Sequence, residues 1–244
     1  MTTQNDIFIR SRLLYGDDIM QRTATARVIL FGVGGVGSWC AEGLVRSGIR
    51  HLTIVDSDNV SVSNINRQLP ALSSTVGRPK VEVLRQRLLD INPEADINAV
   101  LGEYNPDTAG DFRLDDYDYV IDAIDSLSDK ALLILRACSS RATLFSSMGA
   151  ALKTDPDRIA VAEFWKVKGC PLAASLRRRF RKDGTFPQKK FRCVYSGELA
   201  QNRFALESDD PRKKAVNGSV VHITAIYGFR LCALVMGDIA RKTL

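Results

Sequence analysis

Residues 31–40 read FGVGGVGSWC and place four glycines within six positions. A hydrophobic run at 27–31 precedes them, and a helix-compatible run at 39–45 follows. The glycines are Gly32, Gly34, Gly35 and Gly37. They satisfy the pattern G-x-G-x-x-G, in which a tight turn and a helix N-terminus present backbone N–H groups to phosphate. The pattern suits a dinucleotide and a nucleoside triphosphate equally well, so it leaves both a redox enzyme and an adenylating enzyme open.

Around this turn, hydrophobic strand-like segments alternate with amphipathic helix-like segments. We expect strands at 26–31, 51–56, 96–100, 117–121, 143–146 and 159–164. We expect helices at 5–22, 38–47, about 80–91 and about 128–140. The alternation predicts a Rossmann-like α/β fold with a doubly wound, mostly parallel sheet covered on both faces. Residues 1–244 are expected to form one domain, with a basic insertion at about 166–216 before a C-terminal strand and helix.

Composition is compatible with an ordinary soluble protein and with one that binds a polyanion. The chain of 244 residues has a formal net charge of +6 and a pI of about 9.1. Its N-terminus, MTTQNDIFIR, lacks the apolar core of a signal peptide. The apolar stretch 218–237 contains His222 and Arg230, which favours a buried strand and helix over a membrane span.

The five cysteines are dispersed and include no C-x-x-C pair. Such a set is typical of reduced cytosolic thiols rather than of disulfides or a zinc site, so we expect a cytoplasmic protein. Cys193 lies in a polar, basic stretch and is the candidate for a reactive thiol.

Polar residues downstream of the glycine turn favour a triphosphate over a dinucleotide. Asp56 ends the second strand, where a carboxylate can hold the ribose of either nucleotide. The loop that follows contains Asn64, Asn66, Arg67 and Gln68, and Lys80 begins the next helix. Attack at the α-phosphorus of ATP requires cations on the leaving pyrophosphate, and Arg67 and Lys80 can supply them.

Further candidates lie at the first helix and at the end of the fourth strand. Ser38 is near the start of the helix that follows the turn, where its hydroxyl could assist phosphate or backbone amides. Asp122 and Asp125 end a strand at the edge where α/β sheets bind ligands. Carboxylates there could hold Mg²⁺ together with phosphate oxygens.

The order and spacing of these motifs resemble the adenylating domain shared by ubiquitin-activating enzymes and their bacterial relatives in thiamine and molybdopterin synthesis. The matching stretches are GVGGVGS at 32–38, VDSD at 55–58, NINRQ at 64–68, GRPK at 77–80 and DAID at 122–125. The resemblance implies ATP-dependent adenylation of a carboxylate, with the glycine turn and Asp56 on the nucleotide.

The same resemblance assigns further roles. It implies that Asn64, Arg67 and Lys80 act on the phosphates. Asp125 would engage ATP and Mg²⁺. The expected nucleotide site also includes Asp58, Gln68, Asp122 and Ser126. The family is typically dimeric, and Arg12 resembles an arginine that reaches the partner's ATP.

Three further stretches resemble the subfamily of tRNA threonylcarbamoyladenosine dehydratases. They are YVIDAIDS at 119–126, CPLAASLR at 170–177 and RCVYS at 192–196. The resemblance implies that ATP adenylates the threonine carboxylate of a modified adenosine beside the tRNA anticodon, after which the ureido group closes onto it. The alternative is an adenylating enzyme for a ubiquitin-like sulfur-carrier protein, although such relatives usually carry the C-x-x-C pair that is missing here. A cysteine-desulfurase or sulfur-acceptor system is a further partner to consider, and DNA is not expected.

A strongly basic segment agrees with an RNA partner. Residues 166–192 contain ten cations against the single acid Asp183, with phenylalanines between them that could stack an unpaired base. The expected RNA-binding residues are Lys166, Lys168, Arg177, Arg178, Arg179, Arg181, Lys182, Lys189, Lys190 and Arg192. A second cluster follows at Arg212, Lys213 and Lys214.

Overall fold

The computed structural model describes residues 7–206 and 216–241. Its strands are β1 (Arg27–Phe31), β2 (His51–Asp56), β3 (Asp96–Leu101), β4 (Tyr119–Asp122), β5 (Thr143–Ser147), β6 (Ile159–Glu163) and β7 (Arg192–Ser196). Its α-helices are α2 (Ile9–Thr25), α3 (Gly37–Arg46), α4 (Lys80–Ile91), α5 (Leu127–Ser139), α6 (Pro171–Asp183) and α7 (Val221–Arg241). The cluster at 212–214 lies outside the described residues.

The strands form one seven-stranded sheet in the order β3-β2-β1-β4-β5-β7-β6. All neighbours are parallel except β6, which pairs antiparallel with β7. The chain leaves β1 toward β2 on one side and returns to β4 on the other. The direction of winding therefore reverses between β1 and β4, and the crevice at the carboxyl ends of these strands is where such sheets bind ligands. The expected doubly wound α/β fold is confirmed.

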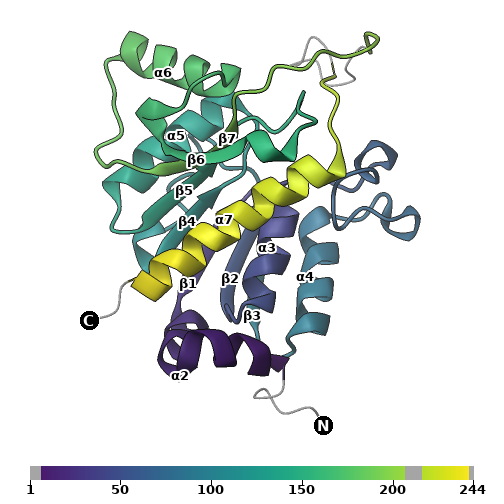
Figure 1. Ribbon diagram of the computed structural model, residues 1–244, viewed down its shortest axis with the longest axis vertical. Helices are drawn as coiled ribbons and strands as arrows, with labels where there is room; N and C mark the ends of the chain where they lie inside the picture. The colour runs from purple at the N-terminus through teal and green to yellow at the C-terminus, as the bar shows by residue number, and fades with distance from the viewer. Residues whose placement is uncertain (1–6, 207–215, 242–244) are drawn as a thin grey trace.

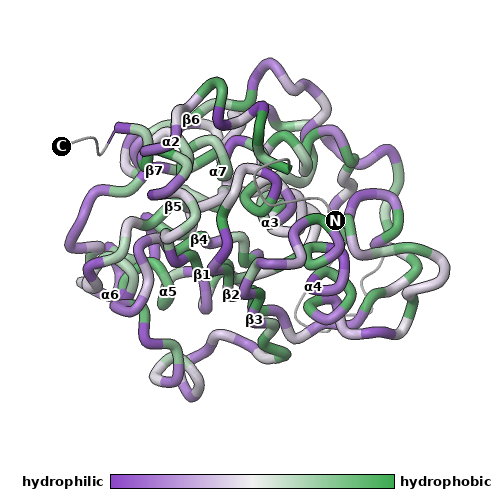
Figure 2. The backbone as a smooth tube through the Cα atoms, turned by 90° about the horizontal axis from the view of Figure 1, so that it is seen from below, coloured by the Kyte–Doolittle hydropathy of each residue, from purple (hydrophilic) through white to green (hydrophobic). Residues whose placement is uncertain are grey.

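Two hydrophobic layers cover the sheet. In β1, Val28 and Leu30 belong to one core cluster and Ile29 and Phe31 to the other, because successive side chains of a strand point to opposite faces. Helices α3, α4 and α7 supply the first cluster, and α5 and α6 supply the second. Figure 1 shows α7 crossing in front of the sheet beside α3, with α5 and α6 behind it. Hydrophobic residues dominate the central strands, whereas hydrophilic residues are frequent in α6 (Figure 2).

The C-terminal part differs from the expectation. The apolar stretch 218–237 forms no strand: from Val221 onward it is the single helix α7. The last strand is β7, which lies inside the segment expected to be an insertion and completes the sheet between β5 and β6. Helix α7 packs closely on α3 because Gly228 has no side chain: a Cβ there would lie 2.5 Å from the carbonyl oxygen of Val36.

Helix α7 is long and apolar enough to cross a membrane by length and composition. In this fold 61% of its apolar window is buried inside the protein. Its apolar character is thus accounted for by packing on α3 and on the sheet, as the internal His222 and Arg230 suggested. No other helix within 7–206 and 216–241 meets the same criteria.

Candidate nucleotide-binding site

The glycine turn connects β1 to α3 at the carboxyl edge of the sheet. Gly32 has a positive φ of 86°, and a Cβ there would lie 2.8 Å from the carbonyl oxygen of Ala123. A Cβ on Gly37 would lie 1.8 Å from the carbonyl oxygen of Gly32. These two positions therefore require glycine, because the turn packs against the end of β4 and closes on itself. At Gly34 the nearest atom to a Cβ is Gln68 Nε2 at 3.7 Å, so its backbone stays accessible.

Ser38 supports the turn from within instead of facing a ligand. Its side chain is fully buried. Its hydroxyl donates to the carbonyl oxygen of Gly34 at 2.6 Å and accepts the N–H of Leu69 at 3.2 Å. Of the two roles expected for this hydroxyl, the structure shows the contact with a backbone amide, and both of its hydrogen-bonding functions are used to join the turn to the 64–69 loop.

Asp56 ends β2 beside the turn and is half-buried. Its carboxylate accepts the N–H of Val33 at 2.7 Å and the N–H of Asp58 at 2.9 Å. Burial raises the pKa of Asp56 above its ordinary value, and the nearby charge of Lys80 opposes that rise. The carboxylate is thus fixed by the turn itself, in the position where a nucleotide ribose is bound in related sheets.

Lys80 begins α4 and is buried, with 4% of its surface exposed. Its ammonium donates to the exposed carboxylate of Asp58 at 2.7 Å. In the preceding loop, Asn64 Oδ1 accepts the N–H of Ser61 at 3.1 Å, which fixes the start of the NINRQ stretch. Gln68 is buried, and its Oε1 has no hydrogen-bond partner. A buried polar atom without a partner, beside the glycine turn, is what a site awaiting a polar ligand presents.

Arg67 and Asp125 come from different segments and interact electrostatically. The Nη1 of Arg67 donates to the carbonyl oxygen of Ser63 at 2.8 Å and to Asn66 Oδ1 at 2.9 Å. Burial lowers the pKa of Arg67, and the charge of Asp125 opposes that effect, which places the two groups within electrostatic reach. Ser126 follows Asp125 directly, and its hydroxyl lies 3.1 Å from that of Ser128 at the start of α5.

Asp122 lies behind the site and not in it. It has no exposed surface, and its carboxylate accepts the ammonium of Lys130 at 2.8 Å and the hydroxyl of Ser146 at 2.6 Å. Lys130 is equally buried and also donates to the carbonyl oxygen of Ile124 at 2.8 Å. The expected nucleotide contact of Asp122 is therefore wrong. This pair instead fixes the 123–126 segment that carries Asp125.

The carboxylates near the turn do not form a preformed metal centre. The part of the chain that the structure describes contains no group of three or more His, Cys, Asp or Glu side chains placed to hold a metal ion. Asp125 is the expected magnesium ligand, and its side chain is exposed at the site. One carboxylate with phosphate oxygens and water fits the way in which Mg²⁺ is held at nucleotide sites.

Arg12 is remote from this site within its own chain. It lies on α2, which precedes β1 and covers the amino end of the sheet (Figure 1). Its Nε lies 3.0 Å from the carboxylate of Asp17. The glycine turn follows β1 at the opposite edge, so Arg12 can serve a nucleotide site only in another copy of the chain.

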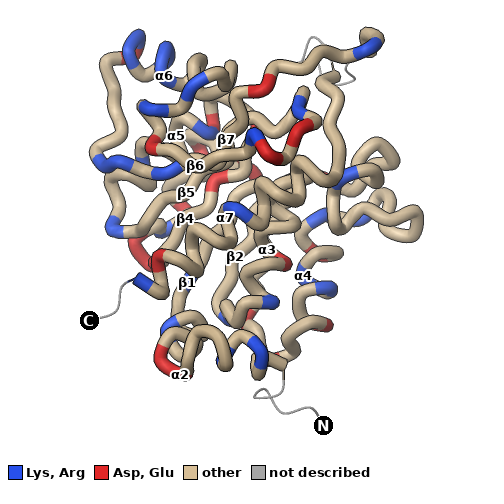
Figure 3. The backbone as a smooth tube through the Cα atoms, in the orientation of Figure 1, with Lys and Arg blue, Asp and Glu red and all other residues tan. Residues whose placement is uncertain are grey.

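Helix α6 brings much of the basic segment beside the candidate site. Figure 3 shows Lys and Arg gathered on α6 and on the segment that leads away from it. A groove of about 430 Å³ separates α6 from the start of α5. It is lined by Leu127, Ser175, Arg178, Arg179, Lys182 and Asp183. Leu127 comes two residues after Asp125, so the groove and the candidate site share the segment that leads into α5.

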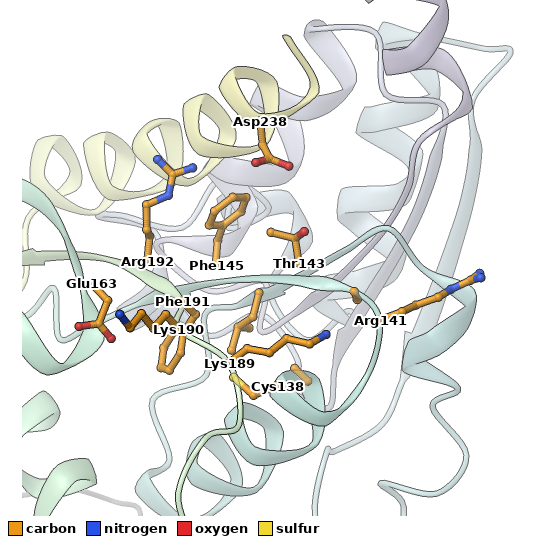
Figure 4. A pocket seen from close by; sticks show the side chains of 13 residues that line it. Cys138, Arg141, Thr143, Phe145, Glu163, Lys189, Lys190, Phe191, Arg192 and Asp238 are labelled. Carbon is orange, nitrogen blue, oxygen red and sulfur yellow. The ribbon is translucent and has the colours of Figure 1, made fainter. Parts of the chain in front are cut away.

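The end of the basic segment lies elsewhere. Lys189, Lys190 and Arg192 line a pocket of about 330 Å³ beside the start of β5, at the amino edge of the sheet (Figure 4). Arg141, which the sequence did not single out, is a further cation of this pocket. Lys189 donates to the carbonyl oxygen of Ser140. The expected RNA-binding cations therefore do not form one surface: Arg178, Arg179 and Lys182 line the groove beside α6, whereas Lys189, Lys190 and Arg192 line this pocket.

Two of the interleaved phenylalanines and the suspected thiol are buried. Phe180 and Phe191 pack in the second core cluster, so neither can stack on RNA. Cys193 lies in β7 with no exposed surface, and burial raises the pKa of its thiol well above the ordinary value. The expectation of a reactive Cys193 is wrong because β7 lies inside the sheet and its Cys193 side chain packs in the second core cluster. Arg177 is half-buried and donates to the carbonyl oxygen of Phe164 at 3.0 Å.

Comparison with known proteins gives a consistent result. The model of the ThiF family matches residues 8–229. The chain is 38% identical over 238 residues to the tRNA threonylcarbamoyladenosine dehydratase of Haemophilus influenzae, covering 94% of this chain and 91% of that protein. Crystal structures of the Escherichia coli tRNA N6-threonylcarbamoyladenosine dehydratase match at 35% identity over 98% of this chain, in complex with AMP (TM-score 0.87, 95% of that chain) and with ATP (TM-score 0.86, 97% of that chain).

Proposed function

Because this chain belongs to the ThiF family, we propose that it is an ATP-dependent tRNA dehydratase that cyclises threonylcarbamoyladenosine through a carboxyl-adenylate. The observation that carries this proposal is the nearly full-length similarity to dehydratases of that name, combined with a glycine turn flanked by Asp56, Arg67 and Lys80. The fold, the ATP-binding character and the class of enzyme follow from the same comparison.

In the proposed reaction the threonine carboxylate attacks the α-phosphorus of ATP. The bond from that phosphorus to pyrophosphate breaks, and the carboxylate becomes an acyl-adenylate. The ureido group of the same nucleoside then attacks the activated carbonyl, loses a proton and expels AMP, which keeps the oxygen of the former carboxylate. The net change in the RNA is the loss of one water molecule.

The residues of the site have different roles in this reaction. The accessible backbone of Gly34 and the N-terminus of α3 hold phosphate, and Asp56 holds the ribose hydroxyls. Lys80 and Arg67 balance the charge that develops on the leaving pyrophosphate. Asn64 and Gln68 lie beside these cations as polar contacts for the phosphates. Mg²⁺, held by Asp125 and phosphate oxygens, would supply further charge neutralisation.

Helix α6 supplies the cations that would bind the RNA. Its groove places Arg178, Arg179 and Lys182 beside the segment that carries Asp125. Cations on this groove can hold the phosphates of an anticodon loop while its modified adenosine enters the nucleotide site. Lys166, Lys168 and Arg181 are also exposed.

Two further points extend the proposal. The exposed side chains of Leu13 and Leu14, at 81% and 80% exposure, follow Arg12 directly on α2. Apolar exposure of this extent is typical of an interface, so α2 supports a homodimer in which Arg12 reaches the partner's ATP. The enzyme is expected in the cytoplasm, where its RNA is found. A sulfur-transfer partner finds no exposed thiol here, since all five cysteines are buried.

The test is incubation of the purified protein with threonylcarbamoyl-modified tRNA, ATP and Mg²⁺. The expected products are AMP, pyrophosphate and a nucleoside lighter by one water. Absence of AMP and an unchanged nucleoside mass would overturn the proposal. Release of pyrophosphate that depends on a small ubiquitin-like protein instead of RNA would favour the sulfur-carrier alternative.

A further inference from the structure

Two exposed aromatic side chains lie beside the basic helix α6 and outside the nucleotide site. Trp165 is 39% exposed and Phe186 is 52% exposed. Their ring centroids are 6.1 Å apart and their planes are inclined by 40°. The two residues come from different segments, the short helix η5 (Phe164–Lys166) and the loop that follows α6.

Trp165 is held rigidly. Its backbone N–H donates to the carboxylate of Glu163, which caps η5. Its ring packs edge-on against Phe164 with centroids 5.2 Å apart. Phe164 is fully buried and stacks on Phe191 at 5.0 Å. The exposed indole is therefore seated on a buried aromatic cluster and loses little conformational entropy when a ligand binds.

The surroundings of this pair are cationic. The guanidinium of Arg181 lies 5.8 Å from the centroid of the Trp165 ring. Lys166 follows Trp165 directly and is exposed. The two acids nearby are engaged within the protein: Glu163 caps η5, and Asp183 pairs with Arg179 at 3.4 Å. Two exposed aromatic rings bordered by cations match a ligand with an aromatic face and an anionic backbone.

We propose that Trp165 and Phe186 form a stacking platform for one unpaired base of the RNA substrate, with Arg181 and Lys166 on the adjoining phosphates. This inference rests on the proposed function, since it specifies how the RNA is held. An acidic protein would satisfy the cations alone. RNA satisfies both the cations and the aromatic pair, because each of its nucleotides offers an aromatic face next to a phosphate. The buried Phe180 and Phe191 serve the platform only as its support.

The experiment measures the dissociation constant of a threonylcarbamoyl-modified anticodon stem–loop as a function of salt. We expect Trp165→Ala to weaken binding by about tenfold with the salt slope unchanged, and Trp165→Phe to restore most of the affinity. Lys166→Ala should weaken binding and make the salt slope shallower, as expected for a phosphate contact. A fully paired RNA duplex of equal length should bind the wild type and Trp165→Ala alike, because it offers no unpaired base.

Phe186→Ala is a second variant, and it should fold normally because Phe186 lies in an exposed loop. Thermal unfolding and ATP binding check that both alanine variants are folded. Unchanged RNA affinity in both alanine variants would overturn the platform. That outcome is distinct from failure of the proposed function, in which the wild type itself would neither bind the modified stem–loop nor form AMP.

Discussion

Lys80 and Asp58 form an ion pair of 2.7 Å in which the lysine is buried and the carboxylate is exposed. The exposed carboxylate contributes little to stability because water screens it. Its effect is to hold a buried ammonium at the edge of the nucleotide site. A phosphate group that enters the site can compete with Asp58 for this ammonium without any rearrangement of α4.

Lys80→Ala should therefore lower adenylation by about 100- to 1,000-fold, and Arg67→Ala should act in the same direction. Both variants should keep most of their RNA affinity, because the proposed function assigns these cations to the triphosphate and the cations of α6 to the RNA. ATP–pyrophosphate exchange and RNA binding measure the two effects. Arg78→Ala is a matched control: its guanidinium contacts Gln86 at 2.9 Å, so adenylation should stay near the wild-type rate. Equal loss of both activities in Lys80→Ala would contradict this division.

The glycines of the turn should differ sharply in their tolerance of alanine. Gly37→Ala places a Cβ 1.8 Å from the backbone oxygen of Gly32, and only a shift of the turn can relieve this overlap. We expect loss of the folded state or a destabilisation of several kcal/mol. Gly34→Ala, with 3.7 Å to its nearest neighbour, should fold normally and lose ATP affinity. Thermal unfolding and ATP titration distinguish the two. Similar melting temperatures for both variants would show that the turn is more adaptable than its geometry indicates.

Most of the sheet could be predicted because its strands are hydrophobic runs punctuated by glycine, proline and asparagine. The strand at 51–56 and the helix from Lys80 to Ile91 agree with the expectation. The sequence does not predict β7 because the flanks of this strand are strongly basic, and only its pairing between β5 and β6 shows that Cys193 and Val194 are core residues. The sequence predicts a strand and a helix where the structure has α7 alone, because the apolar residues of α7 surround most of the helix and so lack a clear period.

The site residues show the corresponding limit. The DAID motif places Asp122 and Asp125 three positions apart at the end of a strand. It does not show which of the two carboxylates is exposed at the site. That choice depends on Lys130, eight residues away, whose buried ammonium occupies Asp122. The role of the Ser38 hydroxyl likewise depends on a distant residue, Leu69, whose N–H it accepts. Trp165 carried no motif, and its exposure beside Arg181 emerges only when η5 and α6 are brought together.

Removal of only one partner of the buried pair Asp122 and Lys130 should strongly destabilise the protein. Asp122→Ala or Lys130→Ala leaves an unpaired charge in the core, so we expect a loss of about 3–5 kcal/mol in the free energy of unfolding. The double variant should lose less than the sum of the two single losses, because it leaves neither charge unpaired. Urea denaturation of the four proteins measures this coupling. Strict additivity would contradict the assigned role of the pair.

Glu198 should make stability depend on pH in the acidic range. Its carboxylate accepts the N–H of Asp155 at 3.0 Å and the hydroxyl of Thr154 at 2.7 Å, and these bonds lower the pKa of Glu198 to about 2 from an ordinary value of 4.5. Because the folded pKa is the lower one, the stabilisation is present above pH 4.5 and is lost as the pH falls toward 2. In this window the unfolded chain binds more protons, so the free energy of unfolding should rise with pH. Glu198→Gln should flatten that rise, whereas Glu82→Gln, an exposed carboxylate on α4, should leave it nearly unchanged. Urea unfolding on both sides of the window tests this, and an equal pH slope in Glu198→Gln and the wild type would contradict it.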